Sequence, residues 1–236
     1  MAVTAMSLVF ALIMVTPAAS QATSAQTPIS QEQSVPGQAP LEKLMVAWRN
    51  RDFALVRTMA QPLADQQDPD AQYMLGHALA LGLGGPRDIE RAKRLYVKAA
   101  GRGQANAQFA LGELAFQGLE VKKDLTRAAE WFALAAQKNH ALAQFRLGLM
   151  YQQGFGVNQD IDRAIELYEL SADQGERAGQ YHLGLLHLTG NGKPQSYKMA
   201  AEQFELAARQ GDGDSQYNLA LILEGGLAGK SDPGKA

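Results

Sequence analysis

The sequence predicts an all-α solenoid built from 36-residue helix-turn-helix units. Three observations support this fold class: residue columns that recur every 36 positions without insertion, an amphipathic helix pair in each unit, and helix start and stop residues in phase with that pattern. The main columns are Gln72, Gln108, Gln144, Gln180 and Gln216; Leu75, Leu111, Leu147, Leu183 and Leu219; and Gly76, Gly112, Gly148 and Gly184, with Ala220 in the fifth place.

Each unit contains two helices with recognisable ends. The first helix of the first unit is expected over about Ala71 to Leu81, because Gly82 follows at a position that favours left-handed backbone. The second helices are expected to begin at residues whose side chains accept hydrogen bonds from free amides: Asp88, Asp124, Asp160, Ser196 and Asp232. They are expected to end at Gly103, Asn139, Gly175 and Gly211, which tolerate positive φ.

A glycine inside the first helix of four units is locally unfavourable and therefore informative. Gly76 and its equivalents each cost about 1 kcal/mol relative to alanine. Their recurrence predicts a neighbouring helix that is too close for a side chain. We expect alanine pairs on the second helix, such as Ala99-Ala100, to provide the matching small surface, with Tyr96 and its equivalents beside it.

The residues within the units resemble a known family. The run Ala143 to Tyr151, the loop Gly154-Phe155-Gly156-Val157 and the run Arg127 to Phe132 are similar to the Sel1-like repeat. The resemblance covers residues 69–236 as four full repeats and a truncated fifth, although the loop 191–196 departs from the pattern. It implies a right-handed α-α superhelix that acts as a protein-protein adaptor, often in bacterial envelope signalling or surface-polymer assembly.

The residues before the repeats predict export. An apolar run from Ser7 to Val15 is too short to span a bilayer and is followed by small residues, as in a secretory signal peptide. We therefore expect a signal peptide over residues 1–22, cleaved before Gln21 or Thr23, although its start carries no Lys or Arg. The mature protein is then periplasmic or secreted, without stable membrane insertion. The alternative is an intracellular adaptor that keeps this segment.

Two further segments flank the repeats. Residues 23–40 are rich in Gln, Ser, Thr, Ala and Pro and are expected to form a flexible linker. Residues 41–68 are expected to form a degenerate helical hairpin that caps the array, since terminal solenoid units must face water on one side. At the other end, Ala236 aligns with Ala92, so the fifth unit stops early. Either the sequence is truncated there or a partner completes the unit.

Composition excludes several classes of function. The chain has no Cys and only 4 His among its 236 residues, which removes thiol catalysis, disulfides and Cys-ligated metals. A net charge of -2 disfavours nucleic acid as a partner. We expect no enzyme activity, no cofactor and no metal. The alternative is a penicillin-binding or β-lactam-hydrolysing protein of the secreted Sel1-like type, which is disfavoured because those proteins are rich in cysteine.

One pair of columns is a candidate binding surface for a protein or peptide partner, or a polysaccharide. An aromatic ring recurs at one place in every unit, and four residues later a second side chain lies on the same side of the helix. First helices line the concave side of a solenoid, so these rings are able to contact a ligand; alternatively they pack between units. The candidate residues are Tyr73, His77, Phe109, Glu113, Phe145, Leu149, Tyr181, Leu185, Tyr217 and Leu221.

Overall fold

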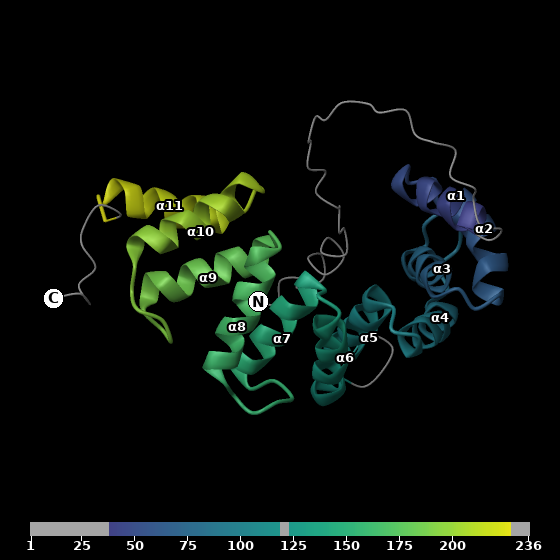
Figure 1. Ribbon diagram of the computed structural model, residues 1–236, viewed down its shortest axis with the longest axis horizontal. Coiled ribbons are helices and arrows are strands. Elements are labelled where there is room, and N and C mark those ends of the chain that lie inside the picture. Colours follow the sequence, from purple (N-terminus) through teal and green to yellow (C-terminus); the bar gives the residue numbers. More distant parts are fainter. Residues whose placement is uncertain (1–37, 119–122, 228–236) are drawn as a thin grey trace, which may run out of the picture. The chain divides into compact units, whose positions relative to one another are not determined.

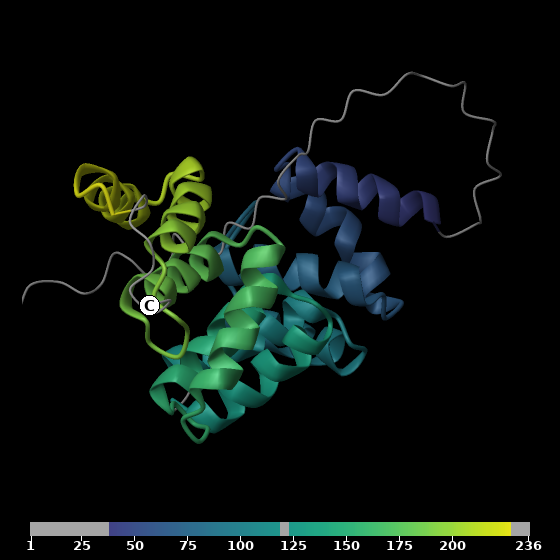
Figure 2. The ribbon, with the colours of Figure 1, turned by 60° about the vertical axis from the view of Figure 1, so that its left-hand side comes forward.

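The computed structural model describes residues 38–118 and 123–227, and these residues form eleven helices and no strand (Figures 1 and 2). The prediction of an all-α repeat fold is confirmed. The helices are α1 Gln38–Arg49, α2 Phe53–Asp65, α3 Pro69–Leu81, α4 Ile89–Gly101, α5 Ala105–Gln117, α6 Leu125–Gln137, α7 Ala141–Gln153, α8 Ile161–Asp173, α9 Arg177–Thr189, α10 Tyr197–Arg209 and α11 Gly213–Glu224.

Each helix packs mainly against the helices that precede and follow it in the sequence. The first helices of the repeats are α3, α5, α7, α9 and α11, and the second helices are α4, α6, α8 and α10. Before them, α1 and α2 occupy the region expected to form the cap. The predicted signal peptide lies outside the described residues, as does the predicted linker up to residue 37.

The linker boundary needs one correction. Helix α1 begins at Gln38, so residues 38–40 are helical and not part of a linker. Pro40, the last residue of the expected linker, lies in the first turn of α1. The N–H groups of a first turn have no partner within the helix, so the missing N–H of a proline costs little there.

The predicted helix starts are present. The side chains of Asp88, Asp124 and Asp160 each accept a hydrogen bond from the backbone N–H three residues on, at 2.9, 2.9 and 3.0 Å. Ser196 does the same at 3.3 Å, while Asp232 lies outside the described residues. These bonds satisfy donors that the helix itself leaves free.

The predicted stop residues also adopt the expected backbone. First helices end at glycines with φ between 69 and 73°, namely Gly82, Gly118, Gly154 and Gly190. After the second helices, φ is 82° at Gly103, 60° at Asn139, 82° at Gly175 and 83° at Gly211. First helices begin two residues before the expected Ala71, because Asp68 caps α3 and Pro69 fits the first turn.

The recurring glycine inside the first helices of four repeats lies under an aromatic ring. A Cβ added to Gly112 would lie 2.6 Å from the ring of Phe132, and one added to Gly76 would lie 2.9 Å from the ring of Tyr96. The close approach that the glycines predict is therefore confirmed. The surface opposite them differs from expectation: it is the ring that covers the glycine, and not the alanine pair.

The recurring glutamine ties four of the five repeats to the helix before them. The side-chain amide of Gln72 donates to the backbone carbonyl of Ala64 at 3.1 Å, and that of Gln108 donates to Ala100 at 3.2 Å. Equivalent bonds join Gln144 to Ala136 and Gln216 to Ala208. The acceptor is always near the end of a preceding helix, where carbonyls lack helical partners. The glutamine column thus fixes the joint between successive units.

Candidate functional site

The ten predicted binding residues lie in pairs on the five first helices, but they differ widely in exposure. Phe109 on α5 and Phe145 on α7 are buried, with exposed fractions of 7% and 6%. On α11, Tyr217 is 65% exposed. The same column therefore contributes to the core in the middle of the array and to the surface at α11.

Tyr73 and His77 belong to a cluster of aromatic rings that Trp48 on α1 completes. The ring of His77 lies 5.4 Å from that of Trp48 on α1 and 5.7 Å from that of Tyr73. Trp48 also contacts Tyr73 at 6.1 Å and Phe53 at 5.9 Å. Trp48 was not predicted as a member of this site. The sequence pattern places Trp48 on the apolar face of an amphipathic helix, but it does not show which residues Trp48 contacts.

The buried rings of the middle repeats lie in the joints between units. Phe109 stacks on His140, which caps the start of α7 in the next repeat, with 4.8 Å between ring centroids. Phe145 contacts Tyr168 of its own repeat at 5.9 Å and His182 of the next at 5.0 Å. This is the arrangement that packing between units requires. The partner-binding role of the ten residues stays a prediction.

A column that the sequence reasoning missed lies one residue after the rings: Met74, Ala110, Arg146, His182 and Asn218. In it, Arg146 on α7 forms an ion pair with Glu113 on α5, with Nε 2.8 Å from Oε1. Gln117 donates a second bond to Glu113 at 3.0 Å. The opposite charges are 33 positions apart, one repeat minus one helical turn. That spacing is a signal that could have found the pair.

The Glu113 carboxyl is shielded from water, and its ionisation reflects this. Only 8% of its side chain is exposed. Burial raises the pKa of Glu113 above its ordinary value, whereas the charge of Arg146 and the bond from Gln117 act in the opposite direction. The predicted binding residue Glu113 therefore joins two repeats by an ion pair, which leaves little of its side chain open to a ligand.

Six half-buried side chains lie on α5, α7 and α9, and we call this set the first-helix strip. It comprises Ala110, Gln117, Arg146, Leu149, His182 and Leu185. Each of the three helices contributes one apolar and one polar side chain to it, and such a mixture suits contact with a peptide or folded partner. Within residues 38–118 and 123–227, no three His, Asp or Glu side chains gather in a way that could hold a metal ion. In the same residues, no helix is both long and apolar enough to cross a bilayer.

The buried histidine of the first repeat makes stability depend on pH. Burial lowers the pKa of His77 from 6.5 to about 4. Because the folded state disfavours the charged ring, the stability that neutral His77 contributes is fully present above pH 6.5. It is lost as the pH falls towards 4. From that difference in pKa we expect lowering the pH from 7 to 4 to cost about 3 kcal/mol through His77.

The variant His77→Leu tests this expectation, since leucine occupies the equivalent position in the third, fourth and fifth repeats. Urea unfolding at pH 7 and pH 4 should show a difference between the two pH values that is smaller in His77→Leu than in the parent by about 3 kcal/mol. An unchanged difference would show that His77 does not titrate with folding.

Comparison with known proteins agrees with this architecture. The Sel1 repeat family matches residues 69–104, 105–140, 141–176, 177–212 and 213–236. Each of the first four segments contains one complete helix pair, from α3–α4 to α9–α10. No functionally curated protein matches the chain.

Two solved structures are similar over most of the described chain. A Sel1 repeat protein from Oxalobacter formigenes is 27% identical with a TM-score of 0.74, and the match covers 82% of each chain. A protective antigen present in uropathogenic Escherichia coli strains, which displays an SLR fold, is 30% identical with a TM-score of 0.70. That match covers 83% of this chain and 43% of the antigen, so this chain spans less than half of the antigen's length. The repeat period, the helix pairs and the five matched segments together show that the chain belongs to the Sel1 repeat family.

Proposed function

We propose that this protein is an exported, non-enzymatic scaffold that holds a protein or peptide partner on the first-helix strip. Sel1 repeats build scaffold folds that commonly serve protein interaction. The observation that carries the proposal is the strip itself: six half-buried side chains on the first helices of three successive repeats offer apolar contacts beside the cation of Arg146 and the imidazole of His182. Binding energy in such interfaces comes from a few apolar and aromatic anchors, and polar neighbours select the partner.

The compartment follows from the N-terminal pattern. The apolar run Ser7 to Val15 and the small residues after it support export to the periplasm or beyond, where the scaffold acts in envelope signalling or surface-polymer assembly. N-terminal sequencing of the mature protein tests this part. A start at Gln21 or Thr23 is expected, and retention of Met1 in the folded product would contradict export.

The binding surface is tested by a pull-down from envelope extracts. The double variant Leu149→Lys/Leu185→Lys introduces two charges into the strip, and we expect it to lose the captured partner. A matched control is Met199→Lys on α10, which changes a side chain that is 47% exposed outside the strip and should leave capture intact. Circular dichroism should show equal helix content for the three proteins.

Equal capture by the strip variant and the control would place the binding surface elsewhere.

The non-enzymatic part of the proposal has its own test. Purified protein is expected to leave the β-lactam nitrocefin unchanged, and clear turnover above the blank would overturn it.

A further inference from the structure

The outer surface of the second helices carries an apolar patch that the first-helix strip does not explain. Val97 on α4, Leu134 on α6 and Leu170 on α8 are 55%, 42% and 49% exposed. We call these three residues and the hollows between them the outer patch. Val97 and Leu170 each line one of these hollows, and contiguous exposed apolar surface marks interaction sites more often than isolated side chains do.

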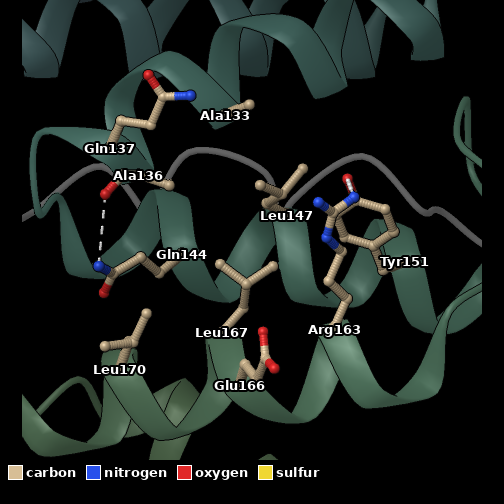
Figure 3. A pocket seen from close by; sticks show the side chains of 10 residues that line it. All are labelled: Ala133, Ala136, Gln137, Gln144, Leu147, Tyr151, Arg163, Glu166, Leu167 and Leu170. Carbon is tan, nitrogen blue, oxygen red and sulfur yellow. Dashed lines mark hydrogen bonds between the residues drawn. The ribbon is translucent and has the colours of Figure 1, made fainter.

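The hollows of the outer patch repeat with the array. One, of about 240 Å³, lies between α4 and α6 over Leu111; the next, of about 310 Å³, lies between α6 and α8 over Leu147. In the second, Arg163 lies over the ring of Tyr151 at 5.3 Å, and Leu167 and Leu170 form an apolar wall (Figure 3). Glu166 also lines this hollow. The second helices α4, α6 and α8 therefore present one grooved surface in that order.

Charge changes sign across this surface. Helix α4 carries four basic residues and one acidic residue, α6 carries one of each, and α8 carries four acidic residues and one basic residue. The net charges of the three helices are thus +3, 0 and -3. Glu169 on α8 is already paired with Lys193, at 2.5 Å, so α8 keeps a net charge of -2 for a partner. A surface with a positive edge, a neutral apolar centre and a negative edge is complementary to a rotated copy of itself.

We propose that the outer patch binds a second copy of this chain, in a two-fold dimer whose axis runs parallel to α6. A two-fold interface brings the same surface of both copies together, so each contact occurs twice. An axis parallel to α6 sets α4 of one copy against α8 of the other and brings the two α6 helices together. An axis perpendicular to α6 would set α4 against α4, where like charges repel.

The repeat period sets the register of the charge pairs. Arg94, Glu130 and Glu166 occupy equivalent positions in three successive repeats, and all three are exposed. An axis parallel to the helices preserves height along them. Arg94 of one copy therefore faces Glu166 of the second copy, on both sides of the central Leu134 residues. The Glu130 residues of the two copies approach each other near the axis, and their like charges oppose association.

Charge exchange tests the dimer in the purified full-length chain. Sedimentation velocity over a range of concentrations should show a monomer–dimer equilibrium that salt weakens. Arg94→Glu and Glu166→Arg should each raise the dissociation constant at least about tenfold, because each places like charges in contact twice. The double variant Arg94→Glu/Glu166→Arg, and an equimolar mixture of the two single variants, should both restore the dimer. Lys198→Glu on α10 makes the same change of charge outside the patch and should have little effect.

A further variant gives an effect of opposite sign. Glu130→Gln removes the repulsion at the axis and should tighten the dimer. Several results would overturn the proposal: a parent chain that stays monomeric at its highest soluble concentration, single variants that are not restored by charge exchange, or a Glu130→Gln chain that dimerises less. Circular dichroism of each variant shows that its helices are intact.

Discussion

Replacing Phe145 with alanine is expected to lower the free energy of unfolding by about 3–5 kcal/mol, because the change leaves a cavity in a joint that cannot close fully. The ring is 6% exposed and lies between Tyr168 of its own repeat and His182 of the next. Its removal therefore weakens packing within one unit and across the joint. Urea unfolding at pH 7, followed by circular dichroism, measures the loss.

The same column supplies a matched control. Tyr217 occupies the equivalent position on α11 and is 65% exposed. Since little surface is buried there, Tyr217→Ala should change the free energy of unfolding by less than about 1 kcal/mol. Equal losses for Phe145→Ala and Tyr217→Ala would mean that burial does not explain the role of the column. A loss for Phe145→Ala below about 1 kcal/mol, together with weaker partner capture, would instead show a ring that faces a ligand.

Replacing Gly156 with alanine is expected to be about as destabilising, by about 3–5 kcal/mol, for two combined reasons. The backbone φ of Gly156 is +69°, which a Cβ disfavours. In addition, that Cβ would lie 2.3 Å from the backbone carbonyl carbon of Leu125, at the start of α6 in the preceding repeat. Gly84 makes the equivalent approach, 2.4 Å from the backbone of Phe53. Backbone cannot move aside as a flexible side chain can, so the loop would have to separate from the preceding unit.

Gly175 separates the two contributions. Its φ is +82°, but a Cβ there would have no neighbouring atom within 4 Å. Gly175→Ala should therefore cost only the conformational part, about 1–2 kcal/mol. The difference between the two variants in urea unfolding measures the close packing of the loop on the preceding repeat. Equal losses would show that the contact between Gly156 and Leu125 contributes nothing.

Local chemistry was predicted well from the sequence. The aspartate or serine that begins each second helix and the glycine that ends a first helix act on backbone groups a few residues away, so their roles can be read without the rest of the fold. The glycine inside the first helix predicted a close neighbour correctly. The prediction that an alanine pair lies opposite it was wrong, because an aromatic ring and an alanine pair recur nearby with the same period and the period does not distinguish them.

Contacts between repeats were harder to predict. A period of 36 shows which residues are equivalent but not which residues of successive units touch. The ion pair between Glu113 and Arg146, the bond from Gln72 to Ala64 and the contact of Trp48 with His77 all cross from one helical unit to another. Which residues touch depends on how far each helix pair is rotated relative to the next helix pair.

The amino-acid sequence alone determined the helical repeat, its boundaries and the family to which it points, because each depends on neighbouring residues and on a period that survives in the chain. Only the tertiary structure decided that the aromatic column is buried at Phe109 and Phe145 and exposed at Tyr217. It also revealed the hollows between α4 and α6 and between α6 and α8, which the sequence did not predict. Burial depends on the neighbours that cover a side chain, and equivalent aromatic residues of one column are covered by different neighbours.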